Sequence, residues 1–213
     1  MIAPEGWPFI LVPGLLGTGL VVFGFPWAGW ILVGLGAFGL YFFRNPPRAC
    51  SAPPEVVCSP ADGKVILVGD APEELCERGL PRQVSVFMSV FDVHVNRAPI
   101  GGELVEYRYN PGRKISAFKE KASLENEQNL CVLRGETGTV AFKQIAGIIA
   151  RRIVFDLEVG DTVARGDRIG LIRYGSRVDL FLPAESEILV TVGERVRAGE
   201  SPMARLGAVE PAQ

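Results

Sequence analysis

The sequence predicts a mainly β protein of the α+β class, in which a sandwich-like β domain follows an N-terminal apolar helical hairpin. Three observations support this fold class. No charged residue occurs between Gly6 and Phe43. Beyond residue 60, short runs rich in β-branched residues alternate with Gly, Pro and Asp, as is typical of strands joined by turns. This part of the sequence also lacks the long amphipathic helices that a doubly wound sheet needs between its strands.

Residues 1–43 are predicted to form a membrane anchor. A spanning helix needs roughly 20 apolar residues, and at the shortest about 17. Pro26 divides the segment into two halves near that lower limit, and glycines in both halves would let two helices pack closely. A signal peptide would need a basic region before its apolar core, whereas Glu5 is the only charged residue before Arg44. Buried helices of a soluble protein are a third interpretation, and length does not separate a full span from a shallow insertion.

A hairpin would return the chain to the side of the membrane on which it began. The first positive charges follow it, in the segment Arg44–Arg48. Because positive residues favour the cytoplasmic side, we expect the protein at the cell membrane, with the remaining chain on the cytoplasmic face. The formal net charge of −2 shows no basic excess, so nucleic acid is not an expected partner.

Residues 44–60 are predicted to be a proline-rich linker, and residues 61–213 a single β-rich domain. Helices are expected only around Pro72–Glu77 and Gly147–Phe155. The predicted strands are Lys64–Val68, Val84–Phe91, Glu103–Tyr109, Leu130–Arg134, Gly138–Ile148, Arg168–Arg173, Arg177–Leu182 and Glu187–Val192.

One internal repeat lies within this domain. Residues 159–167 and 192–200 share the pattern Val-Gly-acidic-x-Val-x-x-Gly-acidic. Glycines at the turn positions allow tight reversals, and the valine between them is expected to point inward. The pattern resembles the turns of biotinyl and lipoyl domains, which indicates architecture rather than function.

The four cysteines are far apart and show no spacing of metal ligands, so no metal site is expected. Without a secretory context, they are interpreted as reduced thiols. The single histidine, His94, is the only imidazole available for chemistry near neutral pH.

Three polar segments interrupt the apolar strands: Ser59–Lys64, Phe91–Pro99 and Ile172–Asp179. In sequence and order they resemble the signature segments of the phosphatidylserine decarboxylase family. The linker Phe42–Arg48 resembles the segment that precedes them in that family. Asn110–Arg113 and Lys121–Glu127 resemble its connecting loops less specifically. The resemblance is to the short, single-histidine Gly-Ser prokaryotic form, and it extends from about Phe42 to Leu182.

The resemblance implies a pyruvoyl-dependent carboxy-lyase that converts phosphatidylserine to phosphatidylethanolamine. Autocatalytic cleavage between Gly175 and Ser176 would give a β chain, residues 1–175, and an α chain, residues 176–213, which stay associated. Ser176 would become a pyruvoyl group that forms a Schiff base with the substrate amine and withdraws electrons as carbon dioxide leaves. The expected partners are a phospholipid membrane and phosphatidylserine, and a homo-oligomer is left open.

Roles follow residue by residue. Ser176 would be the nucleophile of cleavage and the precursor of the cofactor. Gly175 leaves the attacked carbonyl unobstructed and tolerates unusual φ. His94 would be the base for cleavage, the proton donor in turnover, or both, and Asp62 would orient it as the acid of a triad does. Asp92 would be a helper near the same site. Longer members carry a second histidine at the position of Arg97. It is therefore open whether His94 serves in cleavage, in turnover or in both.

Three other functions are alternatives. A serine hydrolase would use Ser176, His94 and Asp62, but the motif G-x-S-x-G is absent from the sequence and such an enzyme would remain one chain. A non-enzymatic adaptor or carrier would join the anchor to a biotinyl/lipoyl-like domain, yet residues 144–213 contain no lysine for a carried group. A decarboxylase of a related serine lipid, archaetidylserine, would present the same head-group chemistry.

Overall fold

The computed structural model describes residues 1–112, 126–147, 152–173 and 175–207. The chain divides into two compact units, Met1–Pro47 and Arg48–Gln213. Each unit has its own packing, and the two are described in turn.

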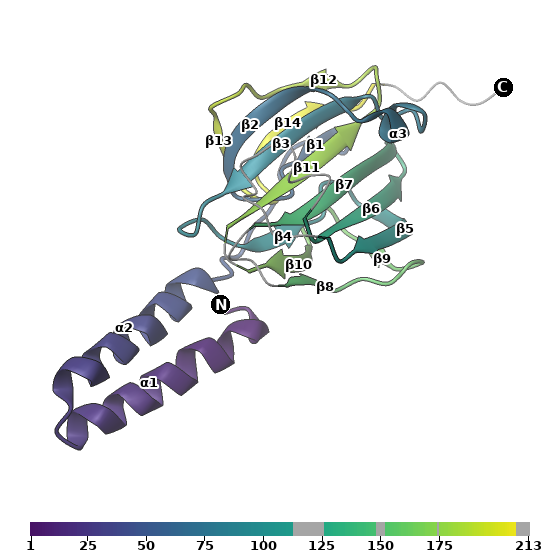
Figure 1. Cartoon of the computed structure of the whole chain (residues 1–213). Helices are drawn as coiled ribbons and strands as arrows, with labels where there is room; N and C mark the ends of the chain where they lie inside the picture. Colours follow the sequence, from purple (N-terminus) through teal and green to yellow (C-terminus); the bar gives the residue numbers. More distant parts are fainter. Residues whose placement is uncertain (113–125, 148–151, 174, 208–213) are drawn as a thin grey trace. The chain divides into compact units, whose positions relative to one another are not determined.

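The first unit is a helical hairpin (Figure 1). A short 3₁₀ helix, η1 (Pro4–Gly6), leads into α1 (Trp7–Val22), and α2 (Pro26–Phe42) begins at the predicted proline. The helices touch at glycines: a Cβ on Gly17 would lie 2.7 Å from the carbonyl oxygen of Gly29. Large apolar side chains point outward from both helices. The stretch Pro4–Val22 is long and apolar enough to cross a membrane, whereas α2 is shorter, and this composition suggests membrane association.

In its described residues, the second unit is built from antiparallel strands and one short helix, α3 (Glu73–Cys76). The strands are β1 (Val56–Cys58), β2 (Gly63–Asp70), β3 (Arg82–Met88), β4 (Val95–Arg97), β5 (Gly102–Asn110), β6 (Gln128–Gly135), β7 (Gly138–Ala146), β8 (Ile153–Phe155), β9 (Thr162–Val163), β10 (Arg168–Ile172), β11 (Ser176–Leu182), β12 (Glu187–Ile188), β13 (Arg195–Val196) and β14 (Pro202–Arg205).

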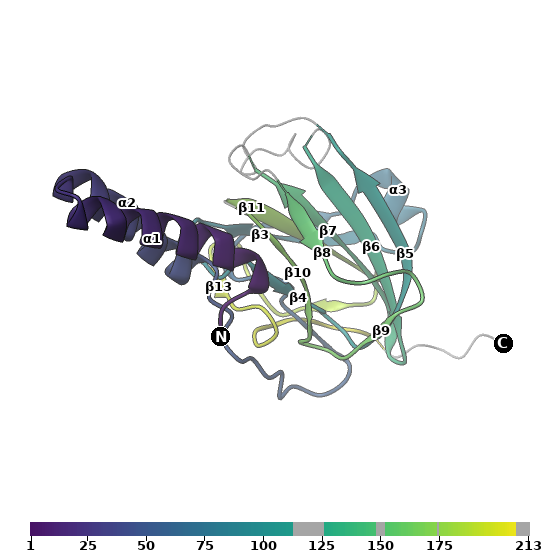
Figure 2. The same cartoon turned by 90° about the horizontal axis from the view of Figure 1, so that it is seen from below.

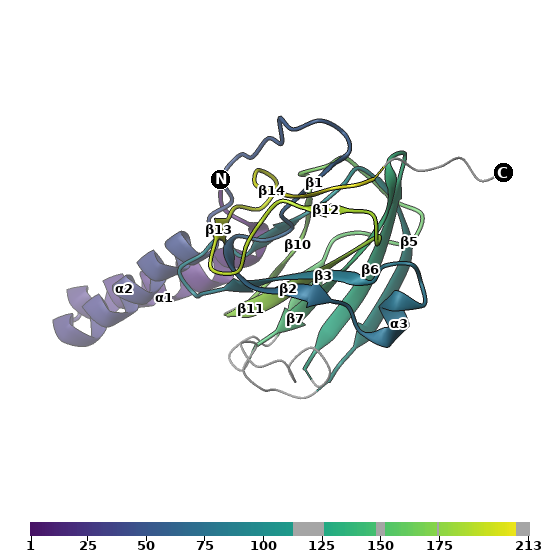
Figure 3. The same cartoon turned by 90° about the horizontal axis from the view of Figure 1, so that it is seen from above.

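A large curled sheet has the strand order β13-β2-β3-β11-β7-β6-β5-β9 (Figure 1). Figure 2 shows its strands β11, β7, β6 and β5 from below. Two three-stranded sheets, β1-β14-β12 and β4-β10-β8, share its main core. Figure 3 shows β1, β12 and β14 together beside the large sheet. Side chains alternate along each strand: on β11, Val178 and Leu180 enter this core, whereas Phe181 joins a smaller cluster on the other face with Leu75 of α3. The expected β-rich, layered fold class is thereby confirmed.

The sequence repeat is also a structural repeat. Gly160 and Gly193 both have φ +100°, and their N–H groups donate to Leu104 and Val65 at 2.8 Å each. The valines between the turn glycines, Val163 and Val196, are buried as expected. The equivalence continues into the strands that the turns join, because β9 pairs with β5 as β13 pairs with β2. The segments that precede β2 and β5 also bond to each other. The Cys58 N–H donates to the Pro99 carbonyl at 2.9 Å, and the Arg97 N–H donates to the Pro60 carbonyl at 3.0 Å.

The predicted strands are present, with adjusted ends. The strand predicted from Val84 stops at Met88, because the Asp92 carboxylate accepts the Ser89 N–H at 2.8 Å and closes a turn. The strand predicted over 187–192 keeps only two residues, β12. The helix expected around Pro72–Glu77 is confirmed as α3. Predicted features at 113, 121–125 and 148 lie outside the described residues.

Two expectations were wrong. The helix expected around Gly147–Phe155 is instead a strand at β8, because residues 153–155 pair with Gly170–Ile172 of β10. Cys50 and Cys58 were expected to be reduced, but their sulfur atoms are 2.08 Å apart and form a disulfide. The linker folds back onto β1, which sequence spacing alone does not reveal. Cys76 and Cys131 are free thiols, and burial raises the pKa of Cys131.

Candidate active site

Ser176 is the first residue of β11, a central strand of the large sheet. It lies opposite Met88 of β3 and Ala146 of β7. Its side chain has no exposed surface, and its hydroxyl donates to the sulfur of Met88 at 3.2 Å. The preceding Gly175 has φ +64°, a left-handed conformation that side chains disfavour. No atom lies within 4 Å of a Cβ built there, so backbone conformation rather than crowding favours glycine.

His94, the residue just before β4, contacts this glycine. Its Nδ1 lies 3.0 Å from the backbone carbonyl oxygen of Asp92. A carbonyl only accepts, so Nδ1 carries the hydrogen and Nε2 is the basic nitrogen. The Gly175 N–H donates to this Nε2 at 3.3 Å. His94 is 2% exposed. The arrangement therefore places the Nε2 lone pair at the N–H of Gly175, the residue that precedes Ser176.

The carbonyl oxygen of Gly175 also has a donor. The backbone N–H of Gly147, the residue after β7, donates to it at 3.1 Å. This is the carbonyl that the Ser176 hydroxyl would attack. A preorganised N–H at such an oxygen stabilises the negative charge that develops during attack.

Asp62 lies in the turn before β2 and is mostly buried. Its Oδ1 accepts the Ala198 N–H at 2.7 Å, and its Oδ2 pairs with Arg48 at 3.0 Å. Gly101 lies directly before β5, as Asp62 lies directly before β2. A Cβ on Gly101 would lie 3.4 Å from the Arg165 nitrogen. Of these two equivalent turns, only the one before β2 thus carries a carboxylate. Its predicted action on His94 stays a prediction.

Asp92 and Arg97 flank the His94 segment. The Asp92 carboxylate caps the Ser89 turn and pairs with Arg195 at 3.1 Å, while its backbone carbonyl orients His94. Arg97 donates to the Gly166 carbonyl at 2.8 Å. Burial, and then the neighbouring Arg48, lower the pKa of Arg97. Arg97 therefore binds the repeat turn, and it cannot act as a base in place of a second histidine.

The sequence interpretation missed several residues around Ser176. Met88, Asn96, Asn129, Gln144 and Gly147 all contribute to the site or its immediate support. A polar residue within an apolar strand is the one signal that could have indicated Gln144 or Asn129. Nothing in the local sequence marks Met88 or Gly147.

The outward face of β11 carries a second buried polar group. Arg177 Nε binds Asp179 Oδ1 at 2.5 Å, and Arg177 also donates to Ser85 at 3.0 Å. Burial raises the pKa of Asp179, although Arg177 opposes that shift. These side chains alternate with Ser176 along the strand and therefore lie on the other side of the sheet.

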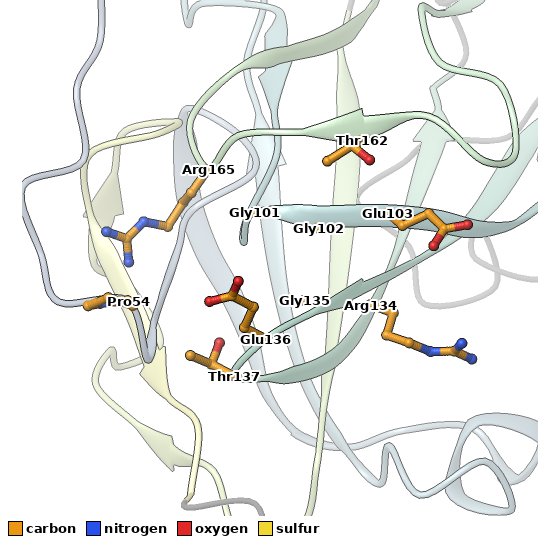
Figure 4. Close-up of a pocket in the computed structure, with 10 residues that line it drawn as sticks. All are labelled: Pro54, Gly101, Gly102, Glu103, Arg134, Gly135, Glu136, Thr137, Thr162 and Arg165. Atoms are coloured by element: carbon orange, nitrogen blue, oxygen red, sulfur yellow. The ribbon is translucent and has the colours of Figure 1, made fainter.

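One pocket of about 690 Å³ lies at the far end of the strands (Figure 4). It is lined by residues that include Thr137, just before β7, whereas Ala146 beside Ser176 ends that strand. Nine residues of strand span about 30 Å, so this pocket is remote from Ser176. Its Arg165 is held by the carbonyls of Val56, at 2.8 Å, and of Pro53 and Ala52. In the described part of the chain, no group of three or more His, Cys, Asp or Glu side chains is arranged to hold a metal ion.

The fold and site define a β-rich protein with a buried Gly-Ser turn and a facing imidazole. The profile of the family described as phosphatidylserine decarboxylase matches residues 35–204. The chain belongs to this family. It is 47% identical over 207 residues to a protein of Syntrophus aciditrophicus, covering 95% of this chain and 96% of that protein. It is 51% identical over 183 residues to a protein of Mycolicibacterium smegmatis, covering 84% and 78%. A protein of Syntrophotalea carbinolica is 46% identical over 201 residues, covering 94% of each. All three are named phosphatidylserine decarboxylase proenzyme.

Proposed function

We propose that this protein cleaves itself between Gly175 and Ser176 and, as a pyruvoyl enzyme, decarboxylates phosphatidylserine to phosphatidylethanolamine. One observation carries the proposal. A fully buried serine follows a left-handed glycine whose N–H contacts the basic nitrogen of His94 and whose carbonyl accepts the Gly147 N–H. The relatives' names, which give both the substrate and a precursor form, support the same function.

In the cleavage, the Ser176 oxygen attacks the Gly175 carbonyl carbon. The C–O bond forms, the C–N bond breaks, and the hydroxyl proton passes through His94 to the Ser176 nitrogen. Loss of the Ser176 α-proton then breaks the bond between Cβ and oxygen, which leaves a carboxylate on Gly175. Addition of water and release of ammonia leave a ketone at residue 176. Burial of Ser176 keeps solvent from hydrolysing the ester before this elimination.

The residues divide the work as follows. Ser176 is the nucleophile, His94 carries the proton, and the Gly147 N–H stabilises the oxygen that becomes negative. Asp62, held by Arg48 and the Ala198 N–H, supplies negative charge that favours the protonated imidazole. Asp92 orients the ring through its backbone carbonyl.

In turnover, the pyruvoyl carbonyl supplies the electron sink that loss of carbon dioxide requires. His94 then lies at the edge of residue 176, where it can return a proton to the substrate carbon. Archaetidylserine carries the same serine head group and is the alternative substrate. A hydrolase is disfavoured because the motif G-x-S-x-G is absent and because such an enzyme would remain one chain. An adaptor would have no use for a buried histidine at a Gly-Ser turn.

We further propose that the hairpin of residues 1–43 anchors the enzyme in the cell membrane, with the catalytic domain on the cytoplasmic face. The outward apolar side chains of α1 and α2 support insertion. The Arg44 guanidinium, 3.9 Å above the Tyr41 ring, supports a position at the membrane–water interface.

The test combines mass spectrometry of the denatured chain with carbon dioxide release from phosphatidylserine vesicles. The wild type should appear as fragments 1–175 and 176–213, the latter beginning with a ketone. Ser176→Ala should remain intact and inactive, whereas Ser186→Ala, which alters a buried serine of the same fragment, should be cleaved normally. Sustained carbon dioxide release by Ser176→Ala would overturn the proposal. Vesicles of archaetidylserine in parallel identify the preferred lipid.

A further inference from the structure

A row of buried amides leads across the core to Ser176. Asn129 of β6, Gln144 of β7 and Asn96 of β4 have no exposed surface; β6 and β7 are consecutive strands, whereas β4 comes much earlier in the sequence. Asn129 Nδ2 donates to Gln144 Oε1 at 2.8 Å, and Gln144 Nε2 donates to Asn96 Oδ1 at 2.7 Å. Asn96 Nδ2 then reaches the Pro60 carbonyl at 3.3 Å and the Met88 sulfur at 3.6 Å.

One backbone group fixes the direction of every bond in this row. The N–H of Gln144 donates to Asn129 Oδ1 at 3.1 Å, so the Asn129 amide can face only one way. That orientation makes Gln144 Oε1 an acceptor and turns Gln144 Nε2 toward Asn96. Asn96 must then accept through its oxygen and present its NH₂ group to Pro60 and Met88.

The row ends on the atom that holds the nucleophile. The Ser176 hydroxyl donates to the Met88 sulfur at 3.2 Å. A thioether is a weak acceptor, so it can direct the hydroxyl hydrogen without binding it strongly. When the hydroxyl hydrogen is directed at Met88, the lone pairs of the Ser176 oxygen point away from the sulfur. Asn96 also links the three signature segments. It lies two residues after His94, bonds to Pro60, two residues before Asp62, and contacts the Met88 sulfur that accepts from Ser176.

Burying three amides costs stability unless each is hydrogen-bonded, and an apolar replacement of similar shape can be nearly neutral. Stability alone therefore gives little reason for polar residues here. We propose that Asn129, Gln144 and Asn96 are positioning residues that set the Ser176 hydroxyl, through Met88, for self-cleavage. This inference rests on the proposed function.

The test measures the rate of precursor cleavage and, separately, carbon dioxide release per mole of pyruvoyl. Met88→Leu keeps the volume and removes the sulfur acceptor, and Gln144→Met keeps the length and removes the amide. Each should slow cleavage about tenfold, as loss of an orienting hydrogen bond in a buried site predicts. Turnover per pyruvoyl should fall less than cleavage does, because the hydroxyl no longer exists in the mature enzyme. Met203→Leu, the same change elsewhere in the core, should cleave at the wild-type rate.

The double variant decides whether the amides act through Met88. If they do, Gln144→Met should have little further effect on cleavage in a Met88→Leu background. Fully additive losses would overturn the proposal, and so would wild-type cleavage by Met88→Leu. Equal losses of cleavage and of turnover per pyruvoyl would indicate a merely structural role. An uncleaved wild-type chain would instead contradict the proposed function, which the same mass spectra report.

Discussion

His94 shows how a single residue acquires its chemical state from its surroundings. The sequence identified it because the chain contains no other histidine. The structure adds which nitrogen is basic, since the Asp92 carbonyl accepts from Nδ1 and the Gly175 N–H meets Nε2. Both of these contacts are to backbone groups, so no local sequence pattern could reveal the tautomer.

Replacing His94 with glutamine should keep a polar side chain but remove the base. We expect precursor cleavage to slow by about 10²-fold or more, the usual contribution of a general base. The Asp92→Asn variant should slow it only slightly, because the bond to His94 comes from the Asp92 backbone. Time courses on denaturing gels measure both. Rapid cleavage by His94→Gln would show that another group takes the proton.

Lys143 should make stability depend on pH in the alkaline range. Burial lowers its pKa, although Glu74 and Asp179 oppose the shift. A lysine with a lowered folded pKa binds fewer protons folded than unfolded, so stability rises as pH increases from the folded pKa toward 10.5. Lys143→Met should raise the melting temperature at pH 7 by a few degrees at most, and the gain should shrink as pH rises. Thermal unfolding of the full chain in detergent measures this.

Lys64→Met, which alters an exposed lysine of β2, is the matched control for Lys143→Met. The difference in melting temperature between Lys64→Met and the wild type should not shrink as pH rises. A gain for Lys143→Met that stays constant from neutral to alkaline pH would indicate improved packing against Phe181 rather than relief of a buried charge.

At the scale of elements, long strands were predictable and short ones were not. Strands such as β5 and β11 contain enough β-branched and aromatic residues to be recognised. β4 is only three residues long and contains the polar Asn96 and Arg97. It is a strand because it pairs with β10. β8 is likewise a strand because it pairs with β10, on the other side from β4. Hydrogen bonding to a distant partner, rather than local propensity, decides such elements.

The hairpin helices should be sensitive to side-chain volume at their contact. Gly17→Leu would place a Cβ 2.7 Å from the Gly29 carbonyl and should force the helices apart, at a cost of about 1–3 kcal/mol. Gly19→Leu, on the same helix with nothing within 4 Å, should be tolerated. Proteolysis in detergent measures this: the hairpin of Gly17→Leu should be cut faster than the hairpin of Gly19→Leu. Equal resistance of the two variants would show that the helices do not pack through these glycines.

At the scale of the molecule, the proposed cleavage site lies within a continuous core. Residues after 175 supply β11, β12, β13 and β14, and β11 pairs with β3 on one side and β7 on the other. Its inward side chains, Val178, Leu180 and Leu182, are fully buried in the main core. The free energy of this burial does not depend on the Gly175–Ser176 bond.

The two fragments should therefore stay together after cleavage. Under native conditions they should co-elute on size exclusion at every protein concentration tested, and they should separate only in denaturant. Liquid chromatography with mass spectrometry of the native peak measures the ratio of fragments, expected to be 1:1. Recovery of a free 176–213 fragment under native conditions would contradict this account of the core.

The sequence by itself determined the apolar hairpin, the β-rich class and the repeated turns, and it predicted the Gly175–Ser176 and His94 chemistry, because each depends on contiguous residues or on residue type. Only the tertiary structure decided that Gly147 faces the Gly175 carbonyl, that Met88 holds the Ser176 hydroxyl and that buried amides stand behind it. These contacts depend on strand register between segments 28 to 88 residues apart, and register is set by which faces of the strands the folded core buries.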